Sequence, residues 1–348
     1  METPGKYIPR LVDKALAAQM EAFGAVLVEG PKWCGKTWTA MRLARSVAWI
    51  ADPAGNYAIR RMAIADPYSL FEADKPILLD EWQDAPGVWD AVRLSVDRVP
   101  GAGQYLLTGS ATPKDSATSH SGTGRIARLR MWPMSLAETG LSSAAVSLSG
   151  LMNGDHPKTA PGGLSEPALI EAILRGGWPG TVASSSAHAT ALPRAYLESV
   201  AESDASRIDG IRRDPVRMLA VLQSLARNTA TVVNNSTLAR DMAGWDAATA
   251  STKTIADYLD VLRRLSVLRE IPAWSTALRS PVRLRRRPKR ILVDPSLAAA
   301  GIGATADTLK ADRKTLGLLL ENLCLRDLSV YAQNIGATVW HYRDESGL

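Results

Sequence analysis

The stretch from Gly30 to Thr37 reads Gly-Pro-Lys-Trp-Cys-Gly-Lys-Thr and matches the pattern GxxxxGK[ST] at every fixed position. A short apolar run from Ala25 to Val28 precedes it, and apolar residues at helical spacing follow it from Trp38 to Arg45. A strand, a glycine-rich turn and a helix in this order build a loop whose backbone N–H groups point inward at a phosphate. The sequence therefore predicts an α/β fold with a parallel sheet, organised around a phosphate-binding loop.

The residue types in this loop suit a nucleotide that carries a magnesium ion. Lys36 can reach the β- and γ-phosphates, and Thr37 can offer its hydroxyl to Mg²⁺. The residues expected to contact the nucleotide are Gly30, Pro31, Lys32, Trp33, Cys34, Gly35, Lys36, Thr37 and Trp38. The alternative is a glycine-rich turn that carries a surface lysine.

After a second predicted strand at 47–50, a third short apolar run, Ile77 to Leu79, ends in two carboxylates. Asp80 at the end of a strand can hold Mg²⁺ directly or through its waters, and Glu81 can polarise the water that attacks the γ-phosphate. An Asp-Glu pair after a strand is common by itself, but this pair follows the phosphate-binding loop within an alternating pattern of strands and helices. We therefore expect Asp80 and Thr37 to be the metal ligands and Glu81 and Lys36 to be catalytic.

Two further positions are candidates for sensing the γ-phosphate. The predicted strand 104–108 ends at Thr108, and Thr108 or Ser110 can orient water there; the alternative is that they cap the strand. Arg125 precedes a fifth predicted strand, 126–131, and an arginine there can stabilise transition-state charge in its own or a neighbouring subunit. The alternative for Arg125 is an ordinary surface arginine.

The composition limits what surrounds this loop. The chain has 348 residues, of which 46% are hydrophobic and 22% are charged. This composition is typical of a globular protein, and the length suits two or three domains. No apolar run approaches the ~18 residues of a membrane span, and the N-terminus has no signal-peptide core. We therefore expect a cytoplasmic protein without membrane contact. The two cysteines and four scattered histidines do not suit a disulfide framework or a zinc site, so Mg²⁺ with ATP is the metal expected.

The basic character of the chain is local. The net charge is +6, and the run 279–290 alone holds seven basic residues and no acid. Candidate contacts to the phosphates of DNA are Arg283, Arg285, Arg286, Arg287, Lys289 and Arg290. The alternatives are a solvated hairpin and a docking surface for an acidic partner.

The second half of the chain is predicted to be mostly helical. Residues 141–165 are rich in Ser, Gly, Pro, Asn and Asp without periodicity, which predicts a linker. From residue 166 the apolar residues follow helical spacing, and a candidate β-hairpin comes after the last of three helices, so we expect a winged-helix region over 166–290. A strand at 290–294, a helix at 316–330 and a strand at 338–342 predict a final α/β piece.

Together these motifs resemble the bacterial and archaeal AAA ATPases that carry a C-terminal DUF4143 region. The stretches that carry the resemblance lie at 30–37, 78–83, 106–110, 124–125, 132–138, 176–179 and 318–322. The resemblance implies an ATPase domain over 1–140, supports the roles given to Lys36, Thr37, Asp80 and Glu81, and makes 291–348 look like an incomplete restriction-endonuclease-like piece. Lys32 and Trp82 depart from the family's usual residues.

The predicted function is ATP binding, with Mg-ATP hydrolysis coupled to a conformational switch of the C-terminal region and a homo-oligomer as a candidate assembly. Two alternatives stay open, a nucleotide-sensing DNA-binding regulator with negligible turnover and a toxin or defence module that acts through a partner. Nuclease activity is not expected, because Glu321 alone cannot supply the converging acids that metal-dependent cleavage needs, and no lysine follows Lys314.

Overall fold

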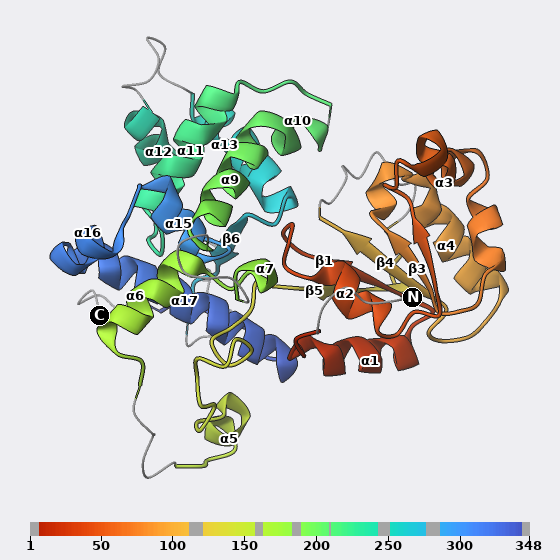
Figure 1. Ribbon diagram of the computed structural model, residues 1–348, viewed down its shortest axis with the longest axis horizontal. Helices are drawn as coiled ribbons and strands as arrows, with labels where there is room; N and C mark the ends of the chain where they lie inside the picture. The colour runs from red at the N-terminus through yellow and green to blue at the C-terminus, as the bar shows by residue number, and fades with distance from the viewer. Residues whose placement is uncertain are drawn as a thin grey trace. The chain divides into compact units, whose positions relative to one another are not determined.

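The computed structural model describes residues 7–110, 121–156, 163–182, 189–208, 210–242, 251–275 and 286–342. The chain divides into two compact units, Met1–Trp132 and Pro133–Leu348. Figure 1 colours the first unit from red to yellow and the second from yellow-green to blue. This division lies near the predicted end of the ATPase domain at residue 140, and the finer domain boundaries remain predictions. No helix in the described ranges is long and apolar enough to cross a bilayer.

The first unit is built on a five-stranded parallel sheet. Its strands are β1 (Ala25–Glu29), β2 (Ser46–Trp49), β3 (Ile77–Asp80), β4 (Tyr105–Gly109) and β5 (Ile126–Arg130). They lie in the order β2-β3-β4-β1-β5, and every neighbouring pair is parallel. The parallel sheet predicted from the sequence is confirmed. Because β4 lies between β1 and β3, the tip of β4 lies between the strand end that precedes the phosphate-binding loop and the strand end that carries the two carboxylates.

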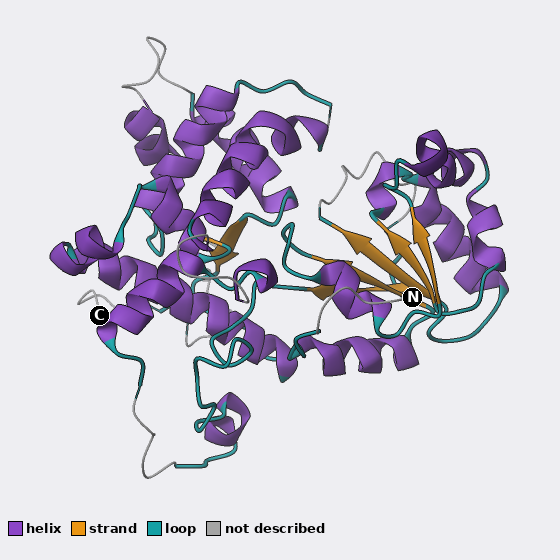
Figure 2. Ribbon diagram, viewed as in Figure 1, coloured by secondary structure: helices purple, strands orange, loops and turns teal. Residues whose placement is uncertain are grey.

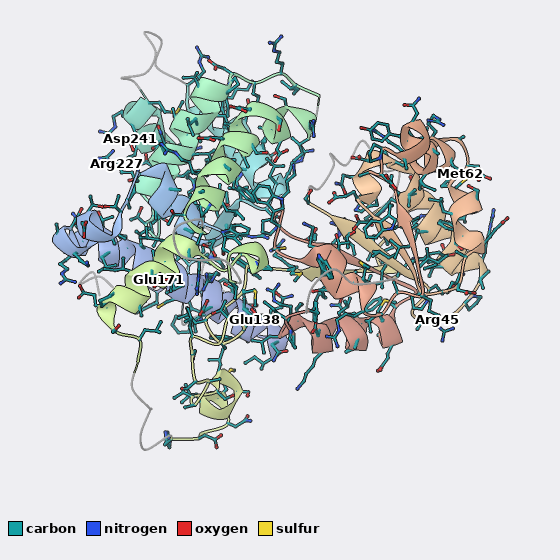
Figure 3. All side chains as sticks on the ribbon, viewed as in Figure 1. Arg45, Met62, Glu138, Glu171, Arg227 and Asp241 are labelled. Atoms are coloured by element: carbon teal, nitrogen blue, oxygen red, sulfur yellow. The ribbon has the colours of Figure 1, made fainter. Side chains whose placement is uncertain are left out.

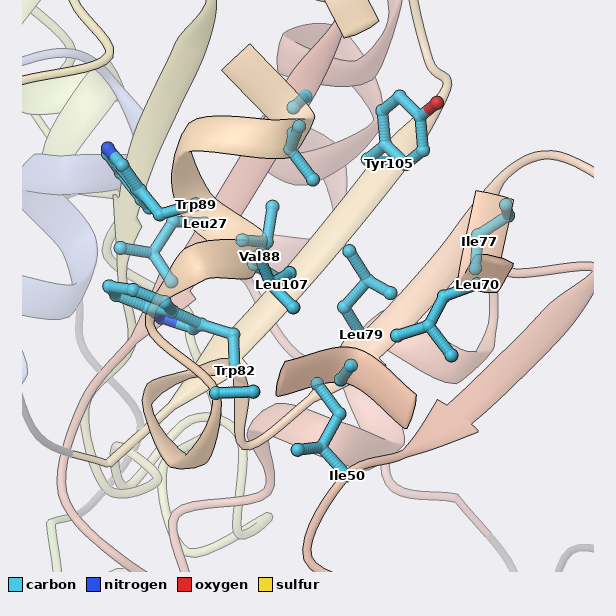
Figure 4. Packing of buried hydrophobic residues seen from close by; sticks show 14 of the residues in the cluster. Leu27, Ile50, Leu70, Ile77, Leu79, Trp82, Val88, Trp89, Tyr105 and Leu107 are labelled. Atoms are coloured by element: carbon cyan, nitrogen blue, oxygen red, sulfur yellow. The ribbon is translucent and has the colours of Figure 1, made fainter. Parts of the chain in front are cut away.

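Alternate residues of the strands face opposite sides of the sheet, and helices cover both sides. The helices and 3₁₀ turns are α1 (Val12–Ala22), α2 (Lys36–Met41), α3 (Ala54–Ala65), η1 (Pro67–Glu72), η2 (Trp82–Asp84) and α4 (Gly87–Arg98). On one side Val26, Leu78 and Leu106 pack with residues of α1 and α2. On the other side Leu79 and Leu107 pack with residues of α3 and α4 (Figure 4). Burial on both faces explains why the central strands β1 and β3 carry continuous apolar runs.

The second unit is mostly helical, as Figure 2 shows. Its elements are α5 (Leu148–Met152), α6 (Glu166–Arg175), α7 (Pro179–Val182), α9 (Ala191–Ser199), a π-helical turn Val200–Asp204, α10 (Ala205–Arg207), α11 (Pro215–Arg227), α12 (Asn235–Met242), α13 (Thr252–Arg264), β6 (Leu268–Ile271), β7 (Lys289–Leu292), α15 (Pro295–Gly301), α16 (Ala306–Ala311) and α17 (Arg313–Asn334). Three helices, α11 to α13, precede the antiparallel pair β6–β7 in the order that the sequence predicts. The name winged helix remains a prediction.

An ion pair joins α11 to α12 in this unit. Figure 3 labels its two residues, Arg227 and Asp241. Burial raises the pKa of the Asp241 carboxyl, but hydrogen bonds from Ser224, Asn228 and Arg227 outweigh burial and leave the pKa below its usual value. The carboxylate therefore stays charged and holds the two helices together.

Three predicted elements of the second half differ in the structure. The predicted linker contains the short helix α5, which Ser147 caps by accepting a hydrogen bond from the Gly150 N–H. The strand predicted at 290–294 pairs antiparallel with β6, so it belongs to the hairpin and does not open a separate α/β piece. The strand predicted at 338–342 is replaced by an isolated bridge between Ala273 and His341 within the described residues. In the two strand segments, the pairing partner available in the fold decided the structure, and local propensity did not.

Candidate nucleotide-binding site

The phosphate-binding loop connects the end of β1 to the start of α2, as predicted. Trp33 and Gly35 both have left-handed backbone conformations, with φ of 63° and 98°. Residues of this kind turn backbone N–H groups toward one side of the loop. Gly30 is required for a different reason, because a Cβ there would lie 2.3 Å from the carbonyl oxygen of Met131. Each of the two fixed glycines of the motif therefore has its own structural cause.

Lys36 is the first residue of α2, and its side chain is buried. Its Nζ donates to the carbonyl oxygen of Pro31 at 2.8 Å. An ammonium group carries three donors, so this one contact leaves capacity for phosphate oxygens. The lysine thus lies inside the loop that the sequence assigns to it and at the positive end of a helix.

Three oxygen-bearing side chains converge at the carboxyl end of the sheet. The hydroxyls of Thr37 on α2 and Thr108 on β4 both donate to Oδ1 of Asp80 on β3, at 2.7 and 2.6 Å. Burial raises the pKa of the Asp80 carboxyl, and the hydrogen bonds from Thr108 and Thr37 offset only part of that effect. A divalent cation held by Thr37 and Asp80 would supply the missing positive charge, and oxygen donors of this kind fit Mg²⁺.

Glu81 follows β3 directly and has a left-handed backbone, with φ of 55°. This conformation costs a residue with a side chain roughly 1–2 kcal/mol, and strain of this kind concentrates at functional sites. Its Oε2 accepts a hydrogen bond from Nε2 of Gln83 and a longer one, 3.4 Å, from the Ser110 hydroxyl. The carboxylate is therefore held by neighbours on η2 and at the tip of β4.

Gln83 is a site residue that the sequence reasoning missed. It lies within the quoted stretch 78–83, but only the fold shows that its amide contacts Glu81. Gly109 makes room for it, since a Cβ at that position would lie 2.7 Å from Oε1 of Gln83 and 3.0 Å from Nε1 of Trp82. The glycine at the tip of β4 is thus the sequence signal that side chains from η2 approach this strand.

Arg10 is a second residue that the sequence reasoning missed. Its side chain is buried, with 7% exposed, and its two terminal nitrogens donate to the carbonyl oxygens of Cys34 and Trp132 at 2.7 and 2.8 Å. These residues are far apart in sequence, so no local pattern indicates the contact.

Arg125 lies where the strands of the sheet begin, at the end opposite to the phosphate-binding loop. It precedes β5, its carbonyl oxygen accepts from the Ala25 N–H at the start of β1, and its guanidinium forms an ion pair with Asp97 at 2.8 Å. The loop follows the opposite end of β1. The structure therefore brings Lys36, Thr37, Asp80, Glu81 and Thr108 to one edge and leaves Arg125 out of the site of its own chain; a role in a neighbouring subunit remains a prediction.

The candidate DNA contacts are only partly within the described residues. Arg283 and Arg285 lie outside them. Lys289 forms an ion pair with Glu321, and Arg290 forms one with Glu270 at 3.1 Å. These two cations are engaged by carboxylates of their own unit, which an acid-free run of sequence does not indicate. DNA binding remains a prediction.

Comparison with known proteins gives a separate family match for each of two segments of the chain. Residues 22–140 match the profile of the AAA domain, and residues 166–308 match a domain of unknown function, DUF8612. At this coarse level residues 22–140 form a P-loop domain of the AAA type, as the resemblance implied. The family found for the C-terminal half is DUF8612, and its resemblance to the DUF4143 region stays a prediction.

Two similar proteins come from mycobacteria. They are uncharacterized proteins of Mycobacterium bovis and Mycobacterium tuberculosis, each 26% identical over 327 residues. The alignment covers 93% of this chain and 66% of each relative, so the chain spans just under two thirds of their length.

Two solved structures share coarse similarity with the chain. The Walker-type ATPase of Pyrococcus abyssi is 13% identical, with 83% of this chain and 94% of that chain covered and a TM-score of 0.47. A RuvB variant of Thermotoga maritima is 16% identical, with coverages of 86% and 93% and a TM-score of 0.30.

Proposed function

We propose that the protein binds Mg-ATP and hydrolyses it, and that hydrolysis switches the C-terminal region between two arrangements. One observation carries the proposal: a buried lysine, a buried carboxylate bound by two hydroxyls and a strained glutamate meet at the carboxyl edge of one parallel sheet. Ligands of open α/β sheets bind at this edge. The AAA profile over residues 22–140 supports the same class of chemistry.

Each side chain at this edge has a distinct role in the proposal. Lys36 and the loop N–H groups bind the phosphates, and Thr37 and Asp80 hold Mg²⁺, which when bound neutralises phosphate charge. Thr108 fixes the orientation of the Asp80 carboxylate. Glu81 accepts the proton of the attacking water, and Gln83 keeps that carboxylate in place.

Two substitutions separate binding from chemistry. Lys36→Ala removes a ground-state contact with the phosphates and should weaken ATP binding. Glu81→Gln keeps the shape and an oxygen that can accept from Gln83, so it should bind ATP like the parent and hydrolyse it about 10²-fold or more slowly, the scale of a lost general base. The matched control is Glu72→Gln, an exposed glutamate on η1, which should leave both quantities unchanged. ATP affinity by fluorescence titration and phosphate release measure the two effects.

A Glu81→Gln variant that hydrolyses ATP at the parental rate would contradict the role given to Glu81. A parent protein that binds ATP without turnover would favour the rival prediction of a nucleotide-sensing regulator. Binding of duplex DNA with and without ATP, measured beside the turnover assay, tests that rival directly. Co-purification from the host tests the third prediction, a module that acts through a partner.

A further inference from the structure

We propose that Arg10 is a positioning residue that ties the phosphate-binding loop to the connector, defined here as residues 131–136, through which the first unit continues into the second. The inference rests on the proposed function, because it assigns a consequence to nucleotide in that loop. It predicts that nucleotide binding changes the hydrogen exchange of backbone amides in the connector and that this change requires the Arg10 side chain.

The contact of Arg10 with the loop controls the direction of an N–H group. Its guanidinium donates to the Cys34 carbonyl oxygen at 2.7 Å. That carbonyl and the N–H of Gly35 belong to one planar trans peptide and point in opposite directions. A donor that holds the carbonyl therefore also sets the direction of the Gly35 N–H, at a position where the backbone is left-handed. Arg10 thus acts on the shape of the phosphate cradle from outside it.

The same guanidinium holds the start of the connector. Its other terminal nitrogen donates to the Trp132 carbonyl oxygen at 2.8 Å. The preceding residue, Met131, donates its N–H to the Glu29 carbonyl oxygen at 2.7 Å, and its own carbonyl lies against Gly30. The connector therefore leaves the sheet against Gly30, at the start of the phosphate-binding loop. The planar fork of an arginine holds its two terminal nitrogens in fixed directions toward the two carbonyls, whereas the ammonium of a lysine is a compact group with rotatable donors and does not fix both directions at once.

Arg10 is itself anchored to α2, the helix that follows the loop. Its backbone N–H donates to Asp13, which also accepts from the Tyr7 hydroxyl at 2.7 Å. That hydroxyl lies 3.0 Å from the hydroxyl of Thr39 on α2. Burial is the main cause that raises the pKa of Tyr7 to about 12, so the hydroxyl keeps its proton at neutral pH and can donate. A movement of the loop and α2 would therefore carry Arg10 with it.

The far end of the connector is anchored inside the second unit. The N–H of Met134 donates to the Gly177 carbonyl oxygen at 2.6 Å, and the N–H of Leu136 donates to Oδ2 of Asp327 at 3.0 Å. Gly177 leaves no space for a side chain, since a Cβ would lie 2.0 Å from the Met134 carbonyl oxygen. Asp327 is held in turn by the buried Arg326. A displacement at Trp132 therefore reaches fixed acceptors of the second unit within four positions of the chain.

The test compares hydrogen exchange with and without nucleotide in the parent and in Arg10→Lys. In the parent, saturating ADP or a non-hydrolysable ATP analogue should change the exchange of the Met134 and Leu136 amides by about tenfold, the scale of one hydrogen bond to a charged group. Arg10→Lys should lose this response at saturating nucleotide while keeping the parental melting temperature within a few degrees. The matched control is Arg42→Lys, an exposed arginine that contacts Asp13, which should keep the response.

The outcomes separate this inference from the proposed function. A parent that binds no nucleotide refutes the proposed function and the inference with it. A parent that binds nucleotide without any change in the exchange of 131–136 overturns the inference alone, and so does an Arg10→Lys variant that responds like the parent. If Arg10→Lys does not fold, Tyr7→Phe replaces it, because it removes the hydroxyl that joins Asp13 to Thr39 and should weaken the same response. A Tyr7→Phe variant that responds like the parent would then overturn the inference.

Discussion

Arg326, in the middle of α17, carries a buried charge whose removal should strongly destabilise the second unit. Its side chain is 1% exposed and contacts Asp294 at 2.8 Å and Asp327 at 2.7 Å. Burial lowers the pKa of this guanidinium, but the two carboxylates outweigh burial and hold the pKa above its ordinary value. Arg326→Met keeps an unbranched stem of similar length and removes the charge, so it leaves two carboxylates in the interior without their cation.

The cost of this change follows from burial. Breaking a buried ion pair by removing one partner costs about 3–5 kcal/mol. At roughly 2–4 °C per kcal/mol for a unit of this size, the melting temperature of the second unit should fall by about 10 °C. The matched control lies at the start of the same helix, where Arg313 is 62% exposed and pairs with Glu166 at 2.6 Å. Arg313→Met should cost less than about 1 kcal/mol, as exposed pairs do.

Scanning calorimetry on the full chain measures the melting temperature of both variants under the same conditions. Nucleotide that shifts only one transition identifies the first unit. If Arg326→Met melts within about 1–2 °C of Arg313→Met, the buried pairs contribute little, and the reasoning from burial is wrong.

Two further predictions concern the C-terminal unit. Replacing Arg285, Arg286 and Arg287 with serine should weaken binding of duplex DNA of unrelated sequences and lower its salt dependence by roughly 0.9 log units per log unit of salt for each phosphate that is no longer neutralised; an unchanged slope would move the basic run to a protein partner or to solvent. Supercoiled plasmid with Mg²⁺ or Mn²⁺ should stay intact, because no cluster of acidic ligands surrounds Glu321 within the described ranges and Glu321 pairs with Lys289. Nicking that disappears in Glu321→Ala but survives in Lys36→Ala would overturn this expectation.

The parts of the fold that the sequence predicts well are those set by local pattern. The strands β1, β3 and β4 are short buried runs, and the loop motif combines glycines and a lysine at fixed spacing, so both are readable without tertiary contacts. The second half is harder, because a segment such as 338–342 becomes a strand only if a neighbour pairs with it. Here a single bridge at His341 takes the place of that pairing.

The residues that support the site could not be predicted from the sequence, because their partners are distant along the chain or because a backbone conformation is unusual. Arg10 meets Cys34 and Trp132 only after the sheet has brought the loop and the exit of β5 together. Gln83 is close to Glu81 in sequence, but the left-handed backbone of Glu81 is what turns its carboxylate toward the amide. Neither the distance in the first case nor the backbone conformation in the second is encoded in a pattern of residue types.

The position of Arg125 could have been predicted from the sequence, because the rule that places Asp80 and Glu81 at the carboxyl ends of the strands also applies to Arg125. In a parallel sheet the ligand lies at the carboxyl ends of the strands. Asp80 and Glu81 end or follow a strand and so lie at that edge, whereas Arg125 precedes a strand and must lie at the opposite edge of the same sheet. The structure agrees, since Arg125 contacts the start of β1 and pairs with Asp97. For a charged residue next to a strand, the order along the chain therefore matters. A residue that follows the strand can reach a nucleotide bound by its own subunit, and a residue that precedes the strand lies at the opposite end of the sheet.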